Sequence, residues 1–148
     1  MENRIKALAN FLEVETNEIE TSQYYDNGFS CGNQEYLVLT DKEADEKAEE
    51  EITETLWAFK AEFIIQHCST YEDMDIYEYQ AAVESLQKVQ ERVCESLNPL
   101  VRALIEDMDD FVEDAIMSDG RGHFISHYDG EENEELIDGT WYYIYRID

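Results

Sequence analysis

Apolar residues recur at helical spacing near the start of the chain and through its centre. In residues 2–14, Ile5, Leu8 and Leu12 share one side, which predicts a short amphipathic helix. From Thr40 to about Gln66 the apolar positions are spaced by four, four, four, three and four residues: Ala44, Ala48, Ile52, Leu56, Phe59 and Phe63. This period predicts a second helix, which Thr40 and Glu43 would open as a capping box.

Two further helices are expected after a loop at residues 69–75. The first buries one stripe of aliphatic residues: Val83, Leu86, Val89 and Val93. Asn98 followed by Pro99 predicts the start of the next helix, with Asn98 as its N-cap. That helix is expected to run to about Met117 and to bury Leu100, Val101, Leu104, Met108, Val112 and Ala115.

The remaining apolar residues alternate as they do in strands. Residues 35–40 predict a buried strand, and residues 19–25 predict a weaker one that pairs with it as a hairpin. Near the end of the chain, residues 123–128 and 141–147 predict an antiparallel pair across an acidic loop. These elements predict one α+β domain over residues 1–148, with a short N-terminal helix and three longer helices packed on a small antiparallel sheet.

Charge separates this chain from most domains of its size. The 148 residues contain 10 Lys and Arg against 37 Asp and Glu, a net charge of −27. Hydrophobic residues make up 43% of the chain and aromatics 12%, so we expect a folded domain instead of an acidic disordered tail. Direct binding of nucleic acid or of an anionic membrane is excluded, because both need clusters of Lys and Arg.

The acidic residues gather in three blocks, at residues 41–55, 106–119 and 129–138. Carboxylates three or four residues apart on a helix lie about 5–6 Å from one another at Cβ, so the first two blocks predict charged helix faces. The predicted partner-binding residues are Glu43, Glu46, Glu50 and Glu54, then Glu106, Asp109, Asp110, Glu113 and Asp114, then Glu131, Glu132, Glu134 and Glu135.

These faces approach the charge density of nucleic acid only in combination. Fifteen helical residues span about 22 Å, a length over which duplex DNA carries about 13 charges. One face supplies half of that or less, whereas two or three faces on one side come close. Such a surface would attract the phosphate-binding groove of a DNA- or RNA-handling protein. The alternative is that each face is simply solvated.

Motifs for chemistry are weak throughout the chain. His123 and His127 fall in a predicted strand, where a spacing of four residues separates them by about 13 Å. Residues 107–110 lack the glycine and the terminal Glu of an EF-hand. Cys31, Cys68 and Cys94 form no CxxC pair and predict reduced thiols. We therefore expect a protein that is not an enzyme and that uses no metal or other cofactor.

Two segments resemble proteins of known origin. The stretch EYLVLTDKEADEKAEEEITETLWAFKAEFI at residues 35–64, and the ending DGRGHFISHYDGEENE…YYIYRID, are similar to small acidic bacteriophage and prophage proteins. The resemblance covers about half of the chain and implies a phage or mobile-element source, with no catalytic residues to transfer. Small acidic phage proteins include DNA mimics that inhibit restriction enzymes or CRISPR effectors.

The leading hypothesis is a non-enzymatic anti-CRISPR or anti-restriction inhibitor. It would occupy the basic groove of a bacterial DNA- or RNA-binding protein, such as a Cas effector or a restriction enzyme, by nucleic-acid mimicry. The alternative is a phage accessory protein that binds a basic partner in replication or virion assembly without competing with nucleic acid. The sequence lacks the apolar run of a signal peptide or membrane span, so we expect the host cytoplasm as its compartment. Whether the chain forms a homodimer through exposed strand edges stays open.

Overall fold

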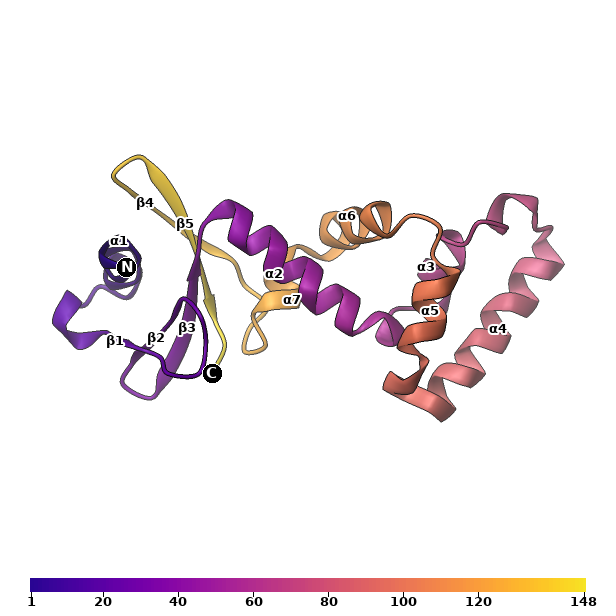
Figure 1. Ribbon diagram of the computed structural model, residues 1–148, viewed down its shortest axis with the longest axis horizontal. Helices are drawn as coiled ribbons and strands as arrows, with labels where there is room; N and C mark the ends of the chain where they lie inside the picture. The colour runs from indigo at the N-terminus through magenta and orange to yellow at the C-terminus, as the bar shows by residue number, and fades with distance from the viewer. The chain divides into compact units, whose positions relative to one another are not determined.

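The first and last parts of the chain together form a five-stranded antiparallel sheet (Figure 1). The computed structural model describes all residues from 1 to 148. The strand order is β1-β2-β3-β5-β4, and the bounds are β1 Glu20–Thr21, β2 Gly28–Cys31, β3 Gln34–Leu39, β4 Asn133–Ile137 and β5 Thr140–Arg146. Seven α-helices accompany the strands, so the predicted α+β class is confirmed.

Contacts within the chain group it into two compact units. The first unit comprises residues 1–49 and 119–148, and the second comprises residues 50–118. The sheet belongs to the first unit, together with α1 (Glu2–Leu12), α7 (Arg121–Ile125) and most of α2 (Asp41–Glu54). The second unit is built from helices and short 3-10 turns. None of the helices is both long enough and apolar enough to cross a membrane.

Helix α1 packs on one face of the sheet, as its apolar side predicts. Ala7 and Leu8 are fully buried there against Val38, Ile144 and Phe29. The helix ends where Glu13 adopts a left-handed conformation with φ of 57°, a conformation that ends many helices. The predicted N-terminal helix is therefore confirmed and is only slightly shorter than expected.

The N-terminal part of the sheet has three strands instead of the predicted two. Residues 35–40 do form a buried strand, β3, but its hairpin partner is β2, and residues 19–25 contribute only the two-residue β1. The turn at Asp26-Asn27-Gly28 leads into β2 instead of β3. Gly28 suits this bend because a Cβ there would lie 2.8 Å from the Cβ of Tyr25.

The predicted strand at residues 123–128 is wrong, because residues 121–125 form α7. Gly122 lets this helix approach the following loop, since a Cβ would lie 2.6 Å from the Gly130 carbonyl oxygen. The true partners of β5 are β3 and β4. Strand β4 lies inside the segment predicted as an acidic loop, and the turn at Asp138-Gly139 closes the β4–β5 hairpin.

The helix predicted from Thr40 to Gln66 is broken into three elements. They are α2, a 3-10 turn η2 (Leu56–Ala58) and α3 (Ala61–Gln66). The apolar period continues through the break, but the Thr53 and Thr55 hydroxyls donate back to carbonyls of the last turn of α2. Side-chain hydrogen bonds of this kind compete with the helix and favour its end.

The helix predicted from residue 98 to residue 117 is also broken. It comprises α5 (Asn98–Leu104) and α6 (Met108–Asp119). Between them the Glu106 N–H donates to the His67 carbonyl at 2.9 Å, and Ile105 forms a β-bridge with Cys68. Asn98 is the first helical residue of α5 and not its N-cap.

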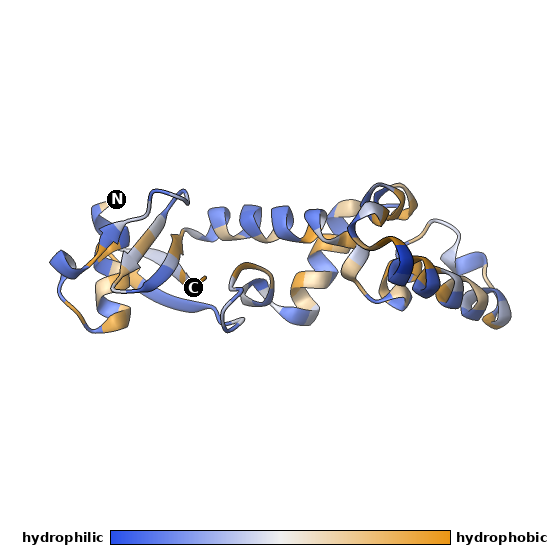
Figure 2. Cartoon of the chain, turned by 90° about the horizontal axis from the view of Figure 1, so that it is seen from below, coloured by the Kyte–Doolittle hydropathy of each residue, from blue (hydrophilic) through white to orange (hydrophobic).

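The helix predicted after residue 75 is confirmed as α4 (Ile76–Val93). Asp75 and Glu78 form a capping box at its start, and the Glu78 N–H donates to Asp75 at 2.8 Å. Val83 and Leu86 are buried, whereas Val89 and Val93 remain about two-fifths exposed. The 3-10 turns η1 (Thr16–Glu18), η3 (Tyr71–Asp73) and η4 (Cys94–Leu97) complete the chain. Figure 2 shows how hydrophobic residues line single sides of the helices.

Candidate functional site: the acidic surfaces

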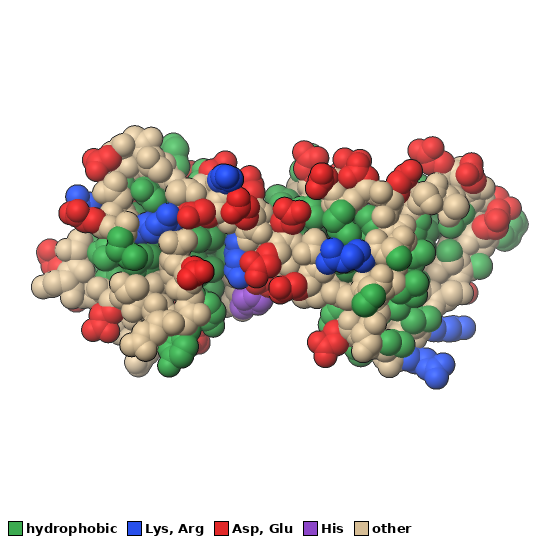
Figure 3. Space-filling model, in the orientation of Figure 1, with side chains coloured by type: hydrophobic (Ala, Val, Ile, Leu, Met, Phe, Trp, Pro, Cys, Tyr) green, Lys and Arg blue, Asp and Glu red, His purple; other side chains and the backbone are tan.

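Eleven of the thirteen predicted partner-binding residues are exposed, and only Glu43 and Glu135 are half-buried. We name each group after its nearest element, since Glu106 precedes α6 and Glu131 and Glu132 precede β4. The α2 block is Glu43, Glu46, Glu50 and Glu54; the α6 block is Glu106, Asp109, Asp110, Glu113 and Asp114; the β4 block is Glu131, Glu132, Glu134 and Glu135. On the face shown in Figure 3, acidic side chains outnumber basic ones.

The α6 block is a row of carboxylates opposite a buried apolar stripe. Phe111, Val112 and Ala115 are buried, whereas Asp109 and Glu113 on the other side are exposed. Phe111 fixes the helix in the second unit through edge-on contacts with Phe59 and Phe63, at centroid distances of 5.0 and 4.9 Å. The predicted spacing is therefore present for Asp109, Asp110 and Glu113 on a well-anchored helix, whereas Glu106 lies in the break before α6 and not on the helix.

The start of α6 is capped by one carboxylate and lined by several others. Asp107 caps the helix, because its side chain accepts hydrogen bonds from the Asp109 and Asp110 N–H groups at 3.1 and 3.3 Å. Residues 106–110 line a shallow hollow of about 430 Å³, and four of these five residues are acidic. A lysine or arginine side chain of a partner would find carboxylates on several sides there.

One member of the α6 block has an internal partner. The Asp114 carboxylate lies 3.1 Å from Nε2 of His67, whose ring also contacts Phe63 and Phe111. Asp114 remains 55% exposed, whereas the His67 side chain is only 14% exposed. Asp114 therefore both positions His67 and contributes charge to the surface.

In the α2 block, Glu43 is held by hydrogen bonds within the protein, whereas Glu46, Glu50 and Glu54 are exposed. Glu43 caps its own helix: its carboxylate accepts from the Thr40 N–H at 2.8 Å, so the predicted capping box is confirmed. The same carboxylate accepts two hydrogen bonds from the Arg4 guanidinium, at 2.7 and 3.0 Å. Glu46 lies 3.9 Å from Lys42 in an exposed pair, and Glu50 and Glu54 are exposed further along. Glu43 is therefore a structural residue.

Burial alone would raise the pKa of Glu43, but the hydrogen bonds from Arg4 and Thr40 outweigh it and lower the pKa to about 2. A lowered pKa in the folded state stabilises the protein above the unfolded value of 4.5, and this contribution disappears as pH falls toward 2. We expect Glu43→Gln to lower the free energy of unfolding by about 1 kcal/mol at pH 7.

Urea unfolding of both proteins between pH 7 and pH 2 checks this expectation. The difference between Glu43→Gln and the parent should shrink as pH falls from about 4.5 to about 2, because the parent carboxylate becomes protonated. Glu46→Gln is the matched control and should stay close to the parent throughout. If the difference in free energy of unfolding between Glu43→Gln and the parent stays constant with pH, the Glu43 carboxylate does not have this stabilising role.

In the β4 block, Glu132 is likewise held by hydrogen bonds within the protein. The Glu132 carboxylate accepts from Nε of Arg121 at 2.8 Å and from the Tyr145 hydroxyl. Burial is the main reason why the pKa of Tyr145 is raised, and the hydrogen bond to Glu132 adds to it. Glu134 and Glu135 follow one another along β4, so their side chains point to opposite faces of the sheet.

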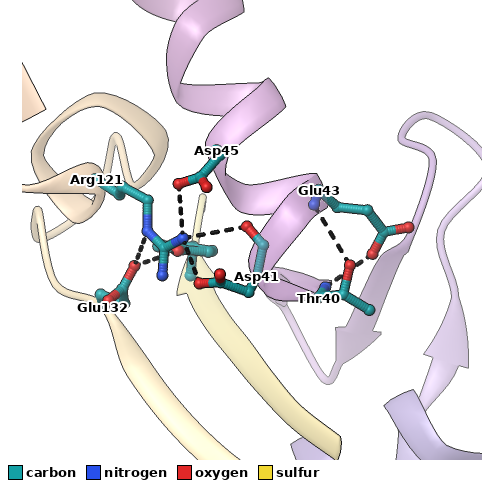
Figure 4. A network of polar contacts seen from close by, with 7 residues as sticks. Thr40, Asp41, Glu43, Asp45, Arg121 and Glu132 are labelled. Atoms are coloured by element: carbon teal, nitrogen blue, oxygen red, sulfur yellow. Dashed lines mark hydrogen bonds and ion pairs between the residues drawn. The ribbon is translucent and has the colours of Figure 1, made fainter. Parts of the chain in front are cut away.

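Arg121 is the residue that sequence reasoning missed. Its guanidinium pairs with Asp41 at 2.9 Å, with Asp45 at 3.0 Å and with Glu132 (Figure 4). It also lies over the Tyr143 ring, 4.6 Å from the centroid. Burial alone would lower the pKa of Arg121, but these hydrogen bonds raise it further above its usual range.

A signal for this role exists in the sequence. Arg121 is the only Lys or Arg between Arg102 and Arg146, within a stretch rich in acids. A lone arginine among carboxylates is a natural centre for an ion-pair network. The predicted strand at residues 123–128 gave Arg121 no role, so this signal was overlooked.

The two histidines that were expected on a strand, His123 and His127, do not lie on one. His123 lies on α7 and His127 follows that helix, so the 13 Å separation expected from a strand does not apply. No group of three or more His, Cys, Asp or Glu residues is arranged to hold a metal ion. The three cysteines are free, and burial raises the pKa of the Cys68 thiol.

Comparison with known proteins adds no relative. No protein-family model, curated protein or solved structure matches this chain. The resemblance to phage proteins therefore stays a prediction, and the acidic surfaces carry the functional argument.

Proposed function

We propose that this protein is a non-enzymatic inhibitor of a bacterial nucleic-acid-binding defence protein, with an anti-CRISPR or anti-restriction role. Its acidic surface would occupy the basic groove in which the target holds DNA or RNA. The α6 block is the observation that carries this proposal, because it combines exposure, regular spacing and a rigid support.

The charge density of α6 suits one strand of a nucleic acid. Its twelve residues span about 18 Å, and four carboxylates lie on the side opposite the buried stripe: Asp109, Asp110, Glu113 and Asp114. One strand of DNA places about five phosphates over that length, at one per 3.4 Å. No Lys, Arg or His occurs between residues 103 and 120, and the basic partner of this row is His67, which lies 3.1 Å from Asp114. A groove built for one phosphate backbone is therefore the best match for α6.

Internal ion pairs occupy part of the α2 and β4 blocks, so we expect these blocks to contribute less to partner binding. Glu43 and Glu132 are each held by an arginine, and Asp41 and Asp45 surround Arg121. Carboxylates that are already paired attract a second basic group more weakly, because the local field is partly cancelled. The α6 block is therefore the first place to test.

The test is capture of a partner from nuclease-treated bacterial lysate by tagged protein at low and high salt. We expect a discrete DNA- or RNA-handling protein that remains bound at moderate salt. The alternative, an accessory protein for replication or virion assembly, predicts a partner whose binding is indifferent to added nucleic acid. A mixture of basic proteins that disappears with salt would contradict the proposal, since nonspecific pairing is screened.

Neutralising the α6 block should weaken that binding strongly. We expect the triple variant Asp109→Asn, Asp110→Asn and Glu113→Gln to raise the Kd at least tenfold, about 1.4 kcal/mol or more. Asp107 and Asp114 are left intact because they cap α6 and pair with His67. Titration calorimetry with the captured partner measures the change.

The matched control removes the same charge from elsewhere in the second unit. Glu72, Glu84 and Glu95 are exposed and lie outside the three blocks, so their triple change to Gln alters the net charge equally. We expect this control to bind nearly as well as the parent. Equal weakening by both triple variants would show that total charge, and not the α6 block, governs binding.

A further inference from the structure

The sheet of the first unit has one open edge of useful length. Its end strands are β1, with two residues, and β4, with five. An edge strand presents unpaired N–H and C=O groups to any chain that can pair with it. Proteins commonly protect such edges with charged side chains, above all lysine, with proline or with a bulge. Strand β4 has the charged residues Glu134 and Glu135 but no lysine, proline or bulge.

The hairpin geometry identifies which backbone groups are available. Asp138 and Gly139 form its two-residue turn, with φ of 51° and 82°. In such a hairpin the flanking pair Ile137 and Thr140 exchanges hydrogen bonds, and hydrogen-bonded pairs then alternate along the strands. The N–H and C=O groups of Glu134 and Leu136 consequently point outward, away from β5.

An exposed apolar pair lies beside these groups. Leu136 is directly opposite Trp141, and the two residues are 50% and 47% exposed. Glu134 projects from the same face and is exposed. The other face of the hairpin is different, because Ile137 and Tyr142 are buried with α1. An apolar contact, a carboxylate and free backbone groups therefore occur together at one edge.

A second copy of the chain fits this edge poorly. If two β4 strands paired about a two-fold axis at Glu135, the two Glu135 residues would face each other. An axis at Glu134 would oppose the two Glu134 residues, and an axis at Leu136 would place Glu134 opposite Asp138. Directly opposed like charges destabilise a pair of strands, so each register is penalised. The charge complements a basic strand instead.

We propose that the β4 edge binds an extended segment of a protein partner by adding an antiparallel strand to the sheet. An apolar residue of that segment contacts Leu136, which lies between it and Trp141 on β5, and a Lys or Arg two positions later pairs with Glu134. The backbone groups of Glu134 and Leu136 supply the hydrogen bonds. This inference is independent of nucleic-acid mimicry, because it rests on main-chain pairing in the first unit and not on the α6 block.

The test uses a labelled synthetic peptide, TTITKTK, and a matched peptide, TTITETE. In antiparallel pairing, isoleucine of the first peptide lies opposite Leu136 and its first lysine lies opposite Glu134. We expect TTITKTK to bind at about 0.15 M salt and TTITETE to bind at least tenfold more weakly. Hydrogen exchange should show new protection at the Glu134 and Leu136 amides.

Variants separate strand addition from charge attraction. Leu136→Pro removes an outward N–H without removing a bond to β5, a position where an edge strand tolerates proline. We expect it to weaken peptide binding at least tenfold, whereas Leu136→Val stays within about twofold because it keeps the N–H and an apolar side chain. Glu134→Lys, which leaves the backbone unchanged, should also weaken binding at least fivefold.

Several results would overturn the proposal. They are absence of TTITKTK binding, equal binding by the Leu136→Pro variant, or protection that appears away from β4. Sedimentation velocity of the parent without peptide gives a further check. A dimer that Leu136→Pro dissociates would show that the edge serves a second copy instead.

Discussion

Replacing Arg121 with alanine is expected to lower the free energy of unfolding by about 3 kcal/mol, the largest effect of any single change considered. The Arg121 side chain is only 11% exposed and joins three carboxylates that come from distant parts of the sequence. Without it, Asp41, Asp45 and Glu132 would repel one another. The Tyr143 ring would also lose the cation that lies over it.

Urea unfolding of Arg121→Ala, Arg121→Lys and the exposed control Arg92→Ala measures this effect. Lysine keeps the charge but lacks the planar fork that reaches several carboxylates, so Arg121→Lys should recover only part of the loss. Arg92 is exposed on α4, and its removal should change stability by less than about 0.5 kcal/mol. An Arg121→Ala protein as stable as the control would contradict the structural role of this network.

Replacing Asn98 with alanine is expected to lower the free energy of unfolding by about 2 kcal/mol. Its side-chain oxygen accepts from the Trp57 N–H at 2.8 Å. Its side-chain nitrogen donates to the Glu54 carbonyl at 2.6 Å and to the Thr53 carbonyl at 3.3 Å. One amide therefore satisfies backbone groups at the end of α2 and at the start of η2.

Thermal and urea unfolding of Asn98→Ala and Asn98→Asp check this expectation. Aspartate keeps the acceptor for Trp57 but brings a negative charge to the two carbonyls, so we expect Asn98→Asp to be at least as destabilised as Asn98→Ala. Ser96→Ala, an exposed change in the neighbouring turn, serves as the control. A loss below about 0.5 kcal/mol for Asn98→Ala would show that water replaces the amide.

Local patterns predicted the elements that depend on neighbours in the sequence. Helices α1 and α4, strand β3 and the capping box at Thr40 all follow from spacing and capping residues within a few positions. The breaks in the two long predicted helices depend on distant residues. The end of α2 is capped by Asn98, more than forty residues away, and α5 ends where Ile105 meets Cys68.

In the candidate site, too, features set by neighbouring residues were predictable and those set by distant residues were not. Charge spacing correctly placed most of the acidic residues on exposed helix faces, because their apolar neighbours fix the orientation of each helix. It could not show that Glu43 and Glu132 have arginine partners, since Arg4 and Arg121 reach them only through the fold. Strand β4 was missed because its Glu-rich sequence resembles a loop, and the Asp138-Gly139 turn was the neglected signal.

Competition with nucleic acid for the captured partner is the decisive measurement for nucleic-acid mimicry. The partner is loaded with its labelled DNA or guide RNA, and the protein is titrated in at fixed, moderate salt. We expect the protein to displace the nucleic acid, and the triple variant of Asp109, Asp110 and Glu113 to require at least a tenfold higher concentration. A ternary complex that retains nucleic acid at saturating protein would contradict nucleic-acid mimicry.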